Sequence, residues 1–218
     1  MNLILFGPPG AGKGTQGTLI CEKFNLKQIS TGDLLRLEIN KGSVLGKEIE
    51  NIINNGNFVS DLIVLKLLEK VISSKDYTNN FILDGYPRNL NQIKNLNDIL
   101  NKNNQYISGI IFLNVNKEII KKRIDGRVFC TKCKKTFNTY FDPPNKNKHT
   151  CKDEFLQKRG DDNLETILHR YDTYMDQTKP VLDYYKKDSS FYEIDGNQEI
   201  SDIFVEINGI LSNLSNWH

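Results

Sequence analysis

The sequence of 218 residues predicts an α/β fold: a doubly wound parallel sheet with helices on both faces. Two observations lead to this prediction. Short apolar runs alternate along the chain with longer segments of helical periodicity. The first apolar run, residues 2–6, ends in a glycine-rich loop, which a helical segment follows. Strands that alternate with helices form a parallel sheet, and ligands then bind at the carboxyl ends of its strands.

The expected strands are the apolar runs. Residues 109–115 are the strongest of them, because a parallel strand buried on both faces is a nearly continuous apolar run. The other expected strands are 2–6, 26–30, 81–84 and 191–195.

Helices are expected between these strands. Ser60 and Asn116 are suitable N-caps for the helices that follow them, and the segment 31–54 should break near Gly42. The expected helices are 13–24, 31–54 in two parts, 61–72, 89–101, one after Asn116, 163–187 up to or through Pro180, and 199–213.

Residues 7–16 read GPPGAGKGTQ, close to the phosphate-binding pattern G-x-x-x-x-G-K-[ST]. Gly14 stands where a Ser or Thr hydroxyl normally holds Mg²⁺, and Thr15 comes one place late. Backbone N–H groups of such a loop, backed by a helix N-terminus, bind phosphate, and Lys13 adds a positive charge. Asp84, at the end of a neighbouring strand, is the expected support for Mg²⁺, directly or through water. The alternative is a capping or turn role for Asp84.

Arginine is rare in this chain, which has 23 Lys and only six Arg. Where most surface cations are Lys, a remaining Arg is more typical of a site that needs a planar, bidentate guanidinium. The alternative is that all six are ordinary surface cations. They are Arg36, Arg88, Arg123, Arg127, Arg159 and Arg170.

The region 127–162 differs from the rest, since it holds three of the four Cys, a Pro-Pro pair and many Lys without helical periodicity. We expect an inserted subdomain there. The C-x-x-C pair of Cys130 and Cys133 indicates metal binding more than a disulfide. Cys21 stands alone in the first helix and is expected in the core.

Composition argues against several classes of protein. A net charge of +2 and the lack of aromatic-basic interleaving argue against a nucleic-acid binder. No run approaches the roughly 18 apolar residues of a membrane span, and MNLILF is too short for a signal peptide. We therefore expect a cytoplasmic protein without membrane partners.

Taken together, the motifs resemble the adenylate kinase family, in its long-lid form with a zinc-type lid. GPPGAGKGT looks like that family's own form of the loop, with Gly before Thr. The segments 28–36 (QISTGDLLR) and 83–92 (LDGYPRNLNQ) are similar to its nucleoside-monophosphate site. The segments 121–127 (KKRIDGR) and 159–163 (RGDDN) are similar to the two ends of its lid. The resemblance covers nearly the whole chain.

This resemblance implies the reaction Mg·ATP + AMP ⇌ 2 ADP, with ATP, AMP and ADP as partners, in a monomer. It implies a P-loop NTPase fold with a five-stranded sheet. The core would comprise 1–29, 60–126 and 163–218, the monophosphate-binding domain 30–59, and the lid 127–162.

The resemblance also implies roles for single residues. Arg88 would clamp the AMP phosphate, Gln92 would read the adenine edge, and Asp84 would support Mg²⁺. Asp161 and Asp162 would support the arginines and lid closure. No general base or catalytic His is expected, because the AMP phosphate is already ionised. ATP contacts would be Gly10, Ala11, Gly12, Lys13, Gly14, Thr15, Arg123, Arg127, Thr136, Phe137 and Gln198. AMP contacts would be Thr31, Arg36, Asn57, Phe58, Val59, Gly85, Tyr86, Pro87, Arg88, Gln92, Arg159 and Arg170. The catalytic cations would be Lys13, Arg88, Arg123, Arg127, Arg159 and Arg170.

Some members of the resembled family hold a structural Zn²⁺ in the lid on C-x₂-C…C-x₂-[CD], and this chain departs from that pattern. Counted back from RGDD, Cys151 takes the fourth place, and the third would be Lys148, which cannot bind zinc. His149 beside it can. The favoured ligands are Cys130, Cys133, His149 and Cys151. A carboxylate ligand, Asp153 or Glu154, and a lid without metal remain alternatives.

Two other functions remain open on the sequence. A kinase for GMP or UMP could use the same loop and arginines, since only base-reading residues such as Thr31 and Gln92 favour AMP. A nucleotide switch or a zinc-ribbon nucleic-acid binder is the more distant alternative, favoured by the Cys pair and the lysines near it.

Overall fold

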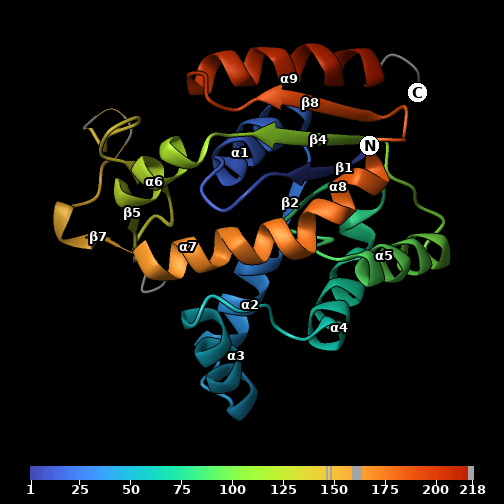
Figure 1. The fold of residues 1–218 in the computed structure, drawn as a ribbon, viewed down its shortest axis with the longest axis horizontal. Helices are drawn as coiled ribbons and strands as arrows, with labels where there is room; N and C mark the ends of the chain where they lie inside the picture. Colours follow the sequence, from blue (N-terminus) through green and yellow to red (C-terminus); the bar gives the residue numbers. More distant parts are fainter. Residues whose placement is uncertain (146, 148, 159–163, 216–218) are drawn as a thin grey trace.

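A five-stranded parallel sheet forms the centre of the computed structural model, which describes residues 1–145, 147, 149–158 and 164–215 (Figure 1). The strand order is β2-β3-β1-β4-β8. This confirms the predicted sheet, with strand ends shifted by at most one residue. The strands are β1 (Asn2–Phe6), β2 (Lys27–Ser30), β3 (Phe81–Asp84), β4 (Gly109–Asn114) and β8 (Phe191–Asp195).

The register of this sheet brings the polar ends of the strands together. Asp84 is paired with Leu5 of β1 on one side and with Ser30 of β2 on the other. The loop after β1, the end of β2 and the end of β3 therefore open at the same edge, where parallel folds bind their ligands.

Helices connect the strands at the predicted places. The segment 31–54 breaks at Gly42, whose φ of +68° lies in the left-handed region. The predicted helix 163–187 runs through Pro180: a π-helical turn, η3 (Tyr174–Thr178), joins α7 to α8, and Pro180 lies in the first turn of α8, where its missing N–H costs little. The helices are α1 (Lys13–Phe24), α2 (Thr31–Asn40), α3 (Val44–Asn54), α4 (Asp61–Ile72), α5 (Leu90–Lys102), α6 (Lys117–Asp125), α7 (Leu164–Thr173), α8 (Lys179–Tyr185) and α9 (Ile200–Ser215), with short 3₁₀ turns η1 (Lys75–Tyr77) and η2 (Asp153–Phe155).

Two of the predicted caps stand in the right place without the predicted bond. Ser60 and Asn116 are the N-cap residues of α4 and α6, but neither side chain makes a cap hydrogen bond. Ser30, Ser43 and Asn89 do accept such bonds, from the backbone N–H groups of the residues three positions on. Side-chain caps therefore fix the starts of α2, α3 and α5.

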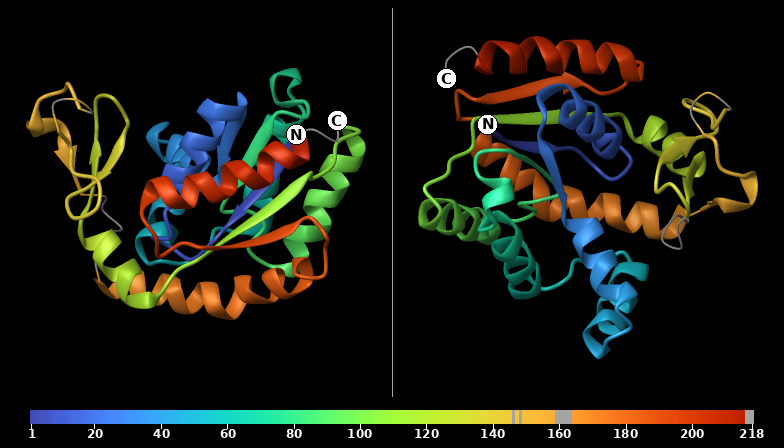
Figure 2. Two further views of the ribbon diagram at one scale, coloured as in Figure 1. Left: turned by 90° about the horizontal axis from the view of Figure 1, so that it is seen from above. Right: turned by 180° about the vertical axis from the view of Figure 1, so that it is seen from behind.

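The core has two layers, one on each face of the sheet. Ile4 and Phe6 of β1 pack into a cluster with residues of α4, α5 and α8. Leu3 and Leu5 of the same strand point to the other face and pack with α1 and α9. This alternation along one strand is what a sheet covered on both sides requires, and Figure 2 shows the helices on the two faces.

Two parts project from this core. The segment after α6 forms a small antiparallel sheet in the order β6-β5-β7, built from β5 (Arg127–Cys130), β6 (Thr136–Asn138) and β7 (Leu156–Gln157). Helices α2 and α3 extend away from the sheet at another place (Figures 1 and 2). The region 127–162, which the sequence predicts to be an inserted subdomain without helical periodicity, holds these three strands and no α-helix among its described residues.

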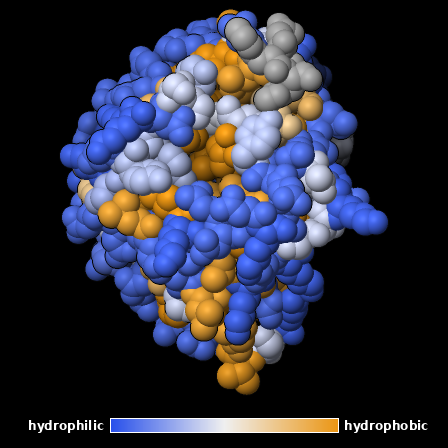
Figure 3. Space-filling model, turned by 90° about the vertical axis from the view of Figure 1, so that its right-hand side faces the viewer, coloured by the Kyte–Doolittle hydropathy of each residue, from blue (hydrophilic) through white to orange (hydrophobic). Residues whose placement is uncertain are grey.

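Hydrophilic residues cover most of the face drawn in Figure 3, and hydrophobic residues appear there in separate areas. Among the described residues, no helix combines the length and the apolarity that a membrane crossing would need.

Candidate nucleotide site

A cavity of about 1220 Å³ opens at the carboxyl edge of the sheet, between the glycine loop, α2 and the small antiparallel sheet. Pockets for one drug-sized ligand typically measure about 300–1,000 Å³. The cavity therefore has room for more than one such ligand.

The glycine loop forms the floor of this cavity. Gly10 and Gly12 have φ of +81° and +95°, values that L side chains rarely adopt. A Cβ on Gly10 would also lie 2.8 Å from a side-chain carbon of Ile124. These glycines let the loop turn beneath α6 and lead directly into the N-terminus of α1, which is a favourable site for an anion.

Lys13 folds back over its own loop. Its Nζ donates to the carbonyl oxygens of Gly7, at 2.7 Å, and Pro8, at 3.0 Å. Burial lowers the pKa of Lys13 to about 8, although the negative charge of Asp84 opposes that shift. The ammonium group thus lies beside the loop whose N–H groups would bind phosphate.

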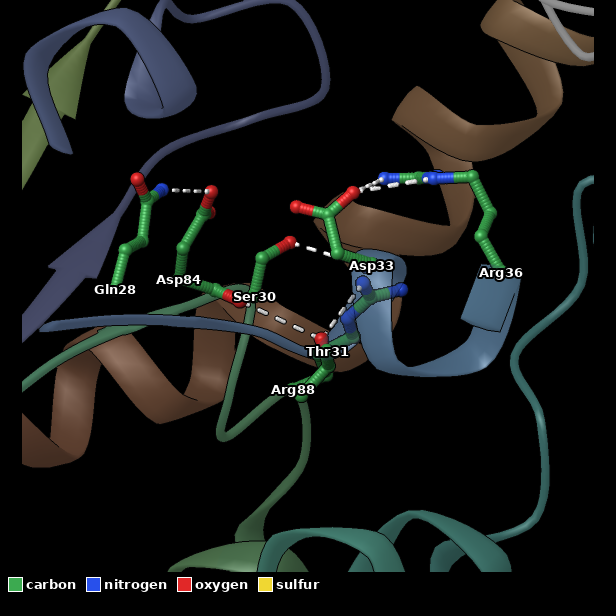
Figure 4. A network of polar contacts seen from close by, with 7 residues as sticks. All are labelled: Gln28, Ser30, Thr31, Asp33, Arg36, Asp84 and Arg88. Carbon is green, nitrogen blue, oxygen red and sulfur yellow. Dashed lines mark hydrogen bonds and ion pairs between the residues drawn. The ribbon is translucent and has the colours of Figure 1, made fainter. Parts of the chain in front are cut away.

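Asp84 lies at the end of β3, on the cavity wall, in a polar network drawn in Figure 4. Burial raises its pKa, and the positive charges of Lys13 and Arg88 oppose the rise. Gln28 Nε2 donates to Asp84 Oδ2 at 3.2 Å. The helix-capping alternative for Asp84 is wrong, because Asn89 caps the next helix.

Arg36 and Asp33, one turn apart on α2, form an ion pair in which Arg36 Nη2 lies 2.6 Å from Asp33 Oδ1 (Figure 4). Asp33 is in turn held by Ser30, whose side chain caps α2. Both members of the pair line the cavity. The carboxylate of Asp33 therefore already occupies the guanidinium group of Arg36 to which a phosphate would bind.

Arg88 is held from several sides. Its Nε donates to the carbonyl oxygen of Gly85 at 2.7 Å, and one Nη donates to Thr31 Oγ1 at 3.4 Å. Its guanidinium carbon lies 4.8 Å from the ring centre of Phe58. Burial, with the nearby charge of Arg170 as the next cause, lowers the pKa of Arg88 to about 10. Two guanidinium groups are thus held in one cavity, as binding of a polyanion requires.

Arg123 joins three parts of the site. One Nη donates to the carbonyl oxygen of Ala11 at 3.0 Å, and the other donates to that of Gln198 at 3.4 Å. Its guanidinium carbon also lies 5.7 Å from the ring centre of Phe141, in the turn that follows β6. Burial lowers the pKa of Arg123.

The structure brings most of the predicted residues to this one cavity. All predicted ATP contacts line it, and so do the five described arginines, for which the surface-cation alternative is wrong. Predicted AMP contacts that do not line the cavity are Thr31, Asn57, Val59, Tyr86 and Gln92. Arg159, Asp161 and Asp162 lie outside the described residues.

Sequence reasoning missed Gln28, Asp33 and Phe141, which also line the cavity. Gln28 is polar, at the second position of a short strand that ends at the site, which is a weak signal. Gln28 and Asp33 both fall within the quoted segment 28–36, and only the bond of Asp33 to Arg36 shows what Asp33 contacts.

A second cluster lies beside the small sheet, at the end of β5. Cys130, Cys133, His149 and Cys151 each offer one ligand atom, and these four atoms lie within 4.8 Å of one another. His149 is buried, and its Nε2 has no hydrogen-bond partner within the described residues. Burial disfavours the Cys130 thiolate, but hydrogen bonds from the Cys133 backbone and from His149 lower the pKa of Cys130 to about 6. Three sulfurs and one imidazole suit Zn²⁺, with bonds of about 2.3 Å and 2.0–2.1 Å.

The cluster contains the four favoured ligands. Asp153 and Glu154 are exposed and lie outside it, so the carboxylate alternative lacks support. The sequence predicted that Cys21 is a buried core residue, and this prediction is wrong. Cys21 is half-buried at the edge of the second core layer, because it lies on the flank of α1, next to the buried Ile20.

Comparison with known proteins identifies the family. The adenylate kinase family model matches residues 5–190. The chain belongs to the adenylate kinase family. It is 54% identical over 211 residues to the adenylate kinase of Pelagibacter ubique, covering 97% of this chain and 99% of that one. It is 41% identical over 215 residues to the adenylate kinase of Methanothrix thermoacetophila, covering 97% and 99%. It is 38% identical over 216 residues to that of Archaeoglobus fulgidus, covering 98% and 99%.

Membership of the adenylate kinase family makes the chain a phosphotransferase, whose reaction is ATP + AMP ⇌ 2 ADP. The family assignment confirms the resemblance noted in the motifs. It favours AMP over GMP or UMP as acceptor, and an enzyme over a nucleotide switch or nucleic-acid binder.

Proposed function

We propose that the chain performs the adenylate kinase reaction with ATP on the glycine-loop side of the cavity and AMP on the α2 side, as a cytoplasmic monomer without membrane or nucleic-acid partners. The observation that carries this proposal is the convergence of Lys13 and five arginines on one cavity large enough for two nucleotides. The core is 1–29, 60–126 and 163–218, and the monophosphate-binding domain and the lid are 30–59 and 127–162.

On the donor side, the loop from Gly10 to Thr15 and the side chain of Lys13 hold the ATP phosphates. Arg123 and Arg127 meet the nucleotide from α6 and from the base of the lid, where Thr136 and Phe137 also contact it. Gln198 completes the site from the segment before α9. Asp84 holds Mg²⁺, directly or through water, and its carboxylate oxygen suits that hard cation. When bound, Mg²⁺ neutralises charge on the transferred phosphoryl group.

On the acceptor side, Arg88 and Arg36 bind the phosphate of AMP, and for Arg36 this means exchanging Asp33 for the phosphate. The adenosine of AMP lies among the residues near Arg88, and Gln92 contacts the edge of the adenine base. The further contacts are Thr31, Asn57, Phe58, Val59, Gly85, Tyr86 and Pro87. Arg159 and Arg170 act on the phosphates of both substrates, and Asp161 and Asp162 support lid closure.

The chemistry needs positioning and charge stabilisation more than proton transfer. Two polyanions repel each other, and the guanidinium groups and Lys13 offset that repulsion. In related transfers a single arginine contributes about 10³–10⁵ in rate. The acceptor is an ionised phosphate oxygen, so no general base acts. Closure of 127–162 over the cavity excludes water, which would otherwise hydrolyse ATP.

The lid holds one structural Zn²⁺ on Cys130, Cys133, His149 and Cys151. The support for this proposal is the donor set and the buried, unpartnered nitrogen of His149. A closed Cys₃His site stabilises a small sheet that has little core of its own, and it leaves no open position for catalysis.

The test is phosphoryl transfer from Mg·ATP to AMP, GMP, CMP and UMP, with each product measured. Fast ADP formation with AMP alone supports the proposal. Preference for another base would agree with the proposed mechanism of phosphoryl transfer but would overturn the assignment of the base contacts. A folded protein that transfers to none of them would overturn the proposal as a whole.

A further inference from the structure

A carboxylate at the start of α4 gathers the side-chain amides at the start of α5. Asp61 accepts from Asn89 Nδ2 at 3.1 and 3.2 Å and from Asn91 Nδ2 at 3.2 Å. Its shortest contact is with Gln92, whose Nε2 donates to Asp61 Oδ1 at 2.5 Å. Neither Asp61 nor Gln92 lines the nucleotide cavity, but Gln92 bonds to the backbone of Arg88, which does line it. The position of Asp61 is therefore that of a residue that acts through its neighbours.

Gln92 is held at both ends of its amide. Its Oε1 accepts the backbone N–H of Arg88 at 2.7 Å, while its Nε2 donates to Asp61. A backbone N–H can only donate and a carboxylate can only accept. These two partners therefore fix which end of the amide carries oxygen. The residue is 2% exposed, so water offers little replacement for either partner.

The orientation of this amide matters for purine recognition. Adenine presents a donor at its 6-amino group and an acceptor at N1. Hypoxanthine and guanine present an acceptor at O6 and a donor at N1, which is the same pair of positions with reversed polarity. The oxygen and nitrogen ends of an amide have nearly the same shape. A 180° rotation of the amide would therefore exchange the complement of one base for that of the other without a change in packing.

We propose that Asp61 is a specificity-determining positioning residue, which holds the Gln92 amide in one orientation and so makes the monophosphate site select 6-aminopurines over 6-oxopurines. The inference rests on the proposed function, in which Gln92 contacts the base of AMP. The bonds to Asp61 and to the Arg88 backbone use one N–H and one lone pair of the Gln92 amide, which has two of each. The remaining N–H and the remaining lone pair can bond to the base. Asp61 itself does not touch the substrate.

The test compares AMP and IMP as acceptors for Mg·ATP. IMP lacks the 2-amino group of GMP, so it differs from AMP only in the polarity of the edge in question. Asp61→Leu keeps the branched shape of the side chain, although it is larger, and has no acceptor. We expect the ratio of kcat/KM for AMP to kcat/KM for IMP to fall about tenfold, chiefly through KM, since a site that orients its polar groups discriminates strongly. Asp61→Asn keeps one acceptor, and its ratio should fall less, by about threefold.

Asn91→Ala is the matched control, because it removes another donor from Asp61 without touching Gln92, and its ratio should stay at the wild-type value. A role of Asp61 limited to tying α4 to α5 would lower the rates with AMP and IMP equally. An unchanged ratio in Asp61→Leu overturns the inference. If Asp61→Leu does not fold, an unchanged ratio in Asp61→Asn overturns the inference instead.

Gln92→Ala separates this inference from the proposed function. If Gln92→Ala leaves the AMP to IMP ratio unchanged, the proposed base contact fails. If Gln92→Ala lowers the ratio and both Asp61 variants leave it unchanged, the base contact holds and only the inference about Asp61 fails.

Discussion

The ammonium group of Lys13 donates to the carbonyl oxygen of Gly7, 2.7 Å away on the same loop. In the absence of nucleotide its pKa is lowered to about 8, first of all by burial. Phosphate oxygens beside it would raise that pKa again. At pH 8.5 most of the lysine is uncharged before ATP binds, so binding should take up protons. At pH 7 the lysine is already charged, and the uptake should be small. Calorimetry of ATP binding in buffers of different ionisation enthalpy measures it.

Lys13→Met is the control for this prediction, and it should abolish the uptake at pH 8.5. The same shift has a consequence for stability. The pKa in the folded chain lies below the unfolded value of 10.5, so the charged lysine destabilises the nucleotide-free protein, fully below pH 8 and less as pH rises toward 10.5. Lys13→Met should therefore unfold at a higher temperature at pH 7. Equal proton uptake in both proteins would assign the titration to another group.

Arg88→Lys should keep the fold and lose AMP-dependent turnover. The planar guanidinium reaches Gly85 and Thr31 at once and leaves donors for a phosphate, whereas an ammonium group is a point charge. We expect kcat to fall on the order of 100-fold, as for loss of one oriented donor at a reacting oxyanion. The measurement is steady-state ADP formation with AMP varied. Lys117→Arg, at the surface of α6, is a matched control. Turnover near the wild-type rate would remove Arg88 from the site.

The Cys130–Cys133–His149–Cys151 cluster predicts one zinc per chain. His149→Ala should lose most of the metal and lower the unfolding temperature, because the three sulfurs would then lack a fourth ligand. Metal content by atomic emission and a thermal melt with and without chelator measure both effects. Cys21→Ser lies outside the cluster and should keep the full metal content. A wild-type protein isolated without metal, and unaffected by added zinc, would contradict this prediction.

Replacement by alanine should have different effects at two glycines that lie within helices. A Cβ on Gly209 of α9 would meet no atom within 4 Å, so Gly209→Ala should stabilise the fold by about 0.5–1 kcal/mol. A Cβ on Gly17 of α1 would lie 2.7 Å from Gln28 Nε2, which holds Asp84. Gly17→Ala should therefore displace Gln28 and raise the Mg²⁺ concentration needed for half-maximal ATP binding. Thermal melts of both variants measure the change in stability, and Mg²⁺ titrations of both measure the Mg²⁺ requirement for ATP binding. A similar gain in stability and an unchanged Mg²⁺ requirement for Gly17→Ala would show that Gln28 does not position Asp84.

Much of this protein follows from local sequence. Residues 2–6, 81–84 and 109–115 are mostly apolar, as strands buried on both faces are, and this pattern predicted β1, β3 and β4 within one residue. Gly10, Gly12 and Lys13 required a phosphate loop at a helix start, since few other sequences adopt that backbone. The scarcity of arginine pointed to six residues, and the five that the structure describes line one cavity. The C-x-x-C spacing indicated a metal site at Cys130 and Cys133, and the resemblance to a zinc-type lid added His149 and Cys151, which the structure brings together with them.

Long-range packing decided the rest, because it depends on which side chains meet after folding. The sequence placed caps at Ser60 and Asn116 but could not show that their side chains make no cap bond. It gave no reason to join Gln28 to Asp84, which are 56 positions apart, or Asp61 to Gln92 on another helix. Sequence alone thus determined which chemical groups the protein has and on which elements they lie. Only the tertiary structure decided their partners, because a hydrogen bond depends on distances that no local pattern records.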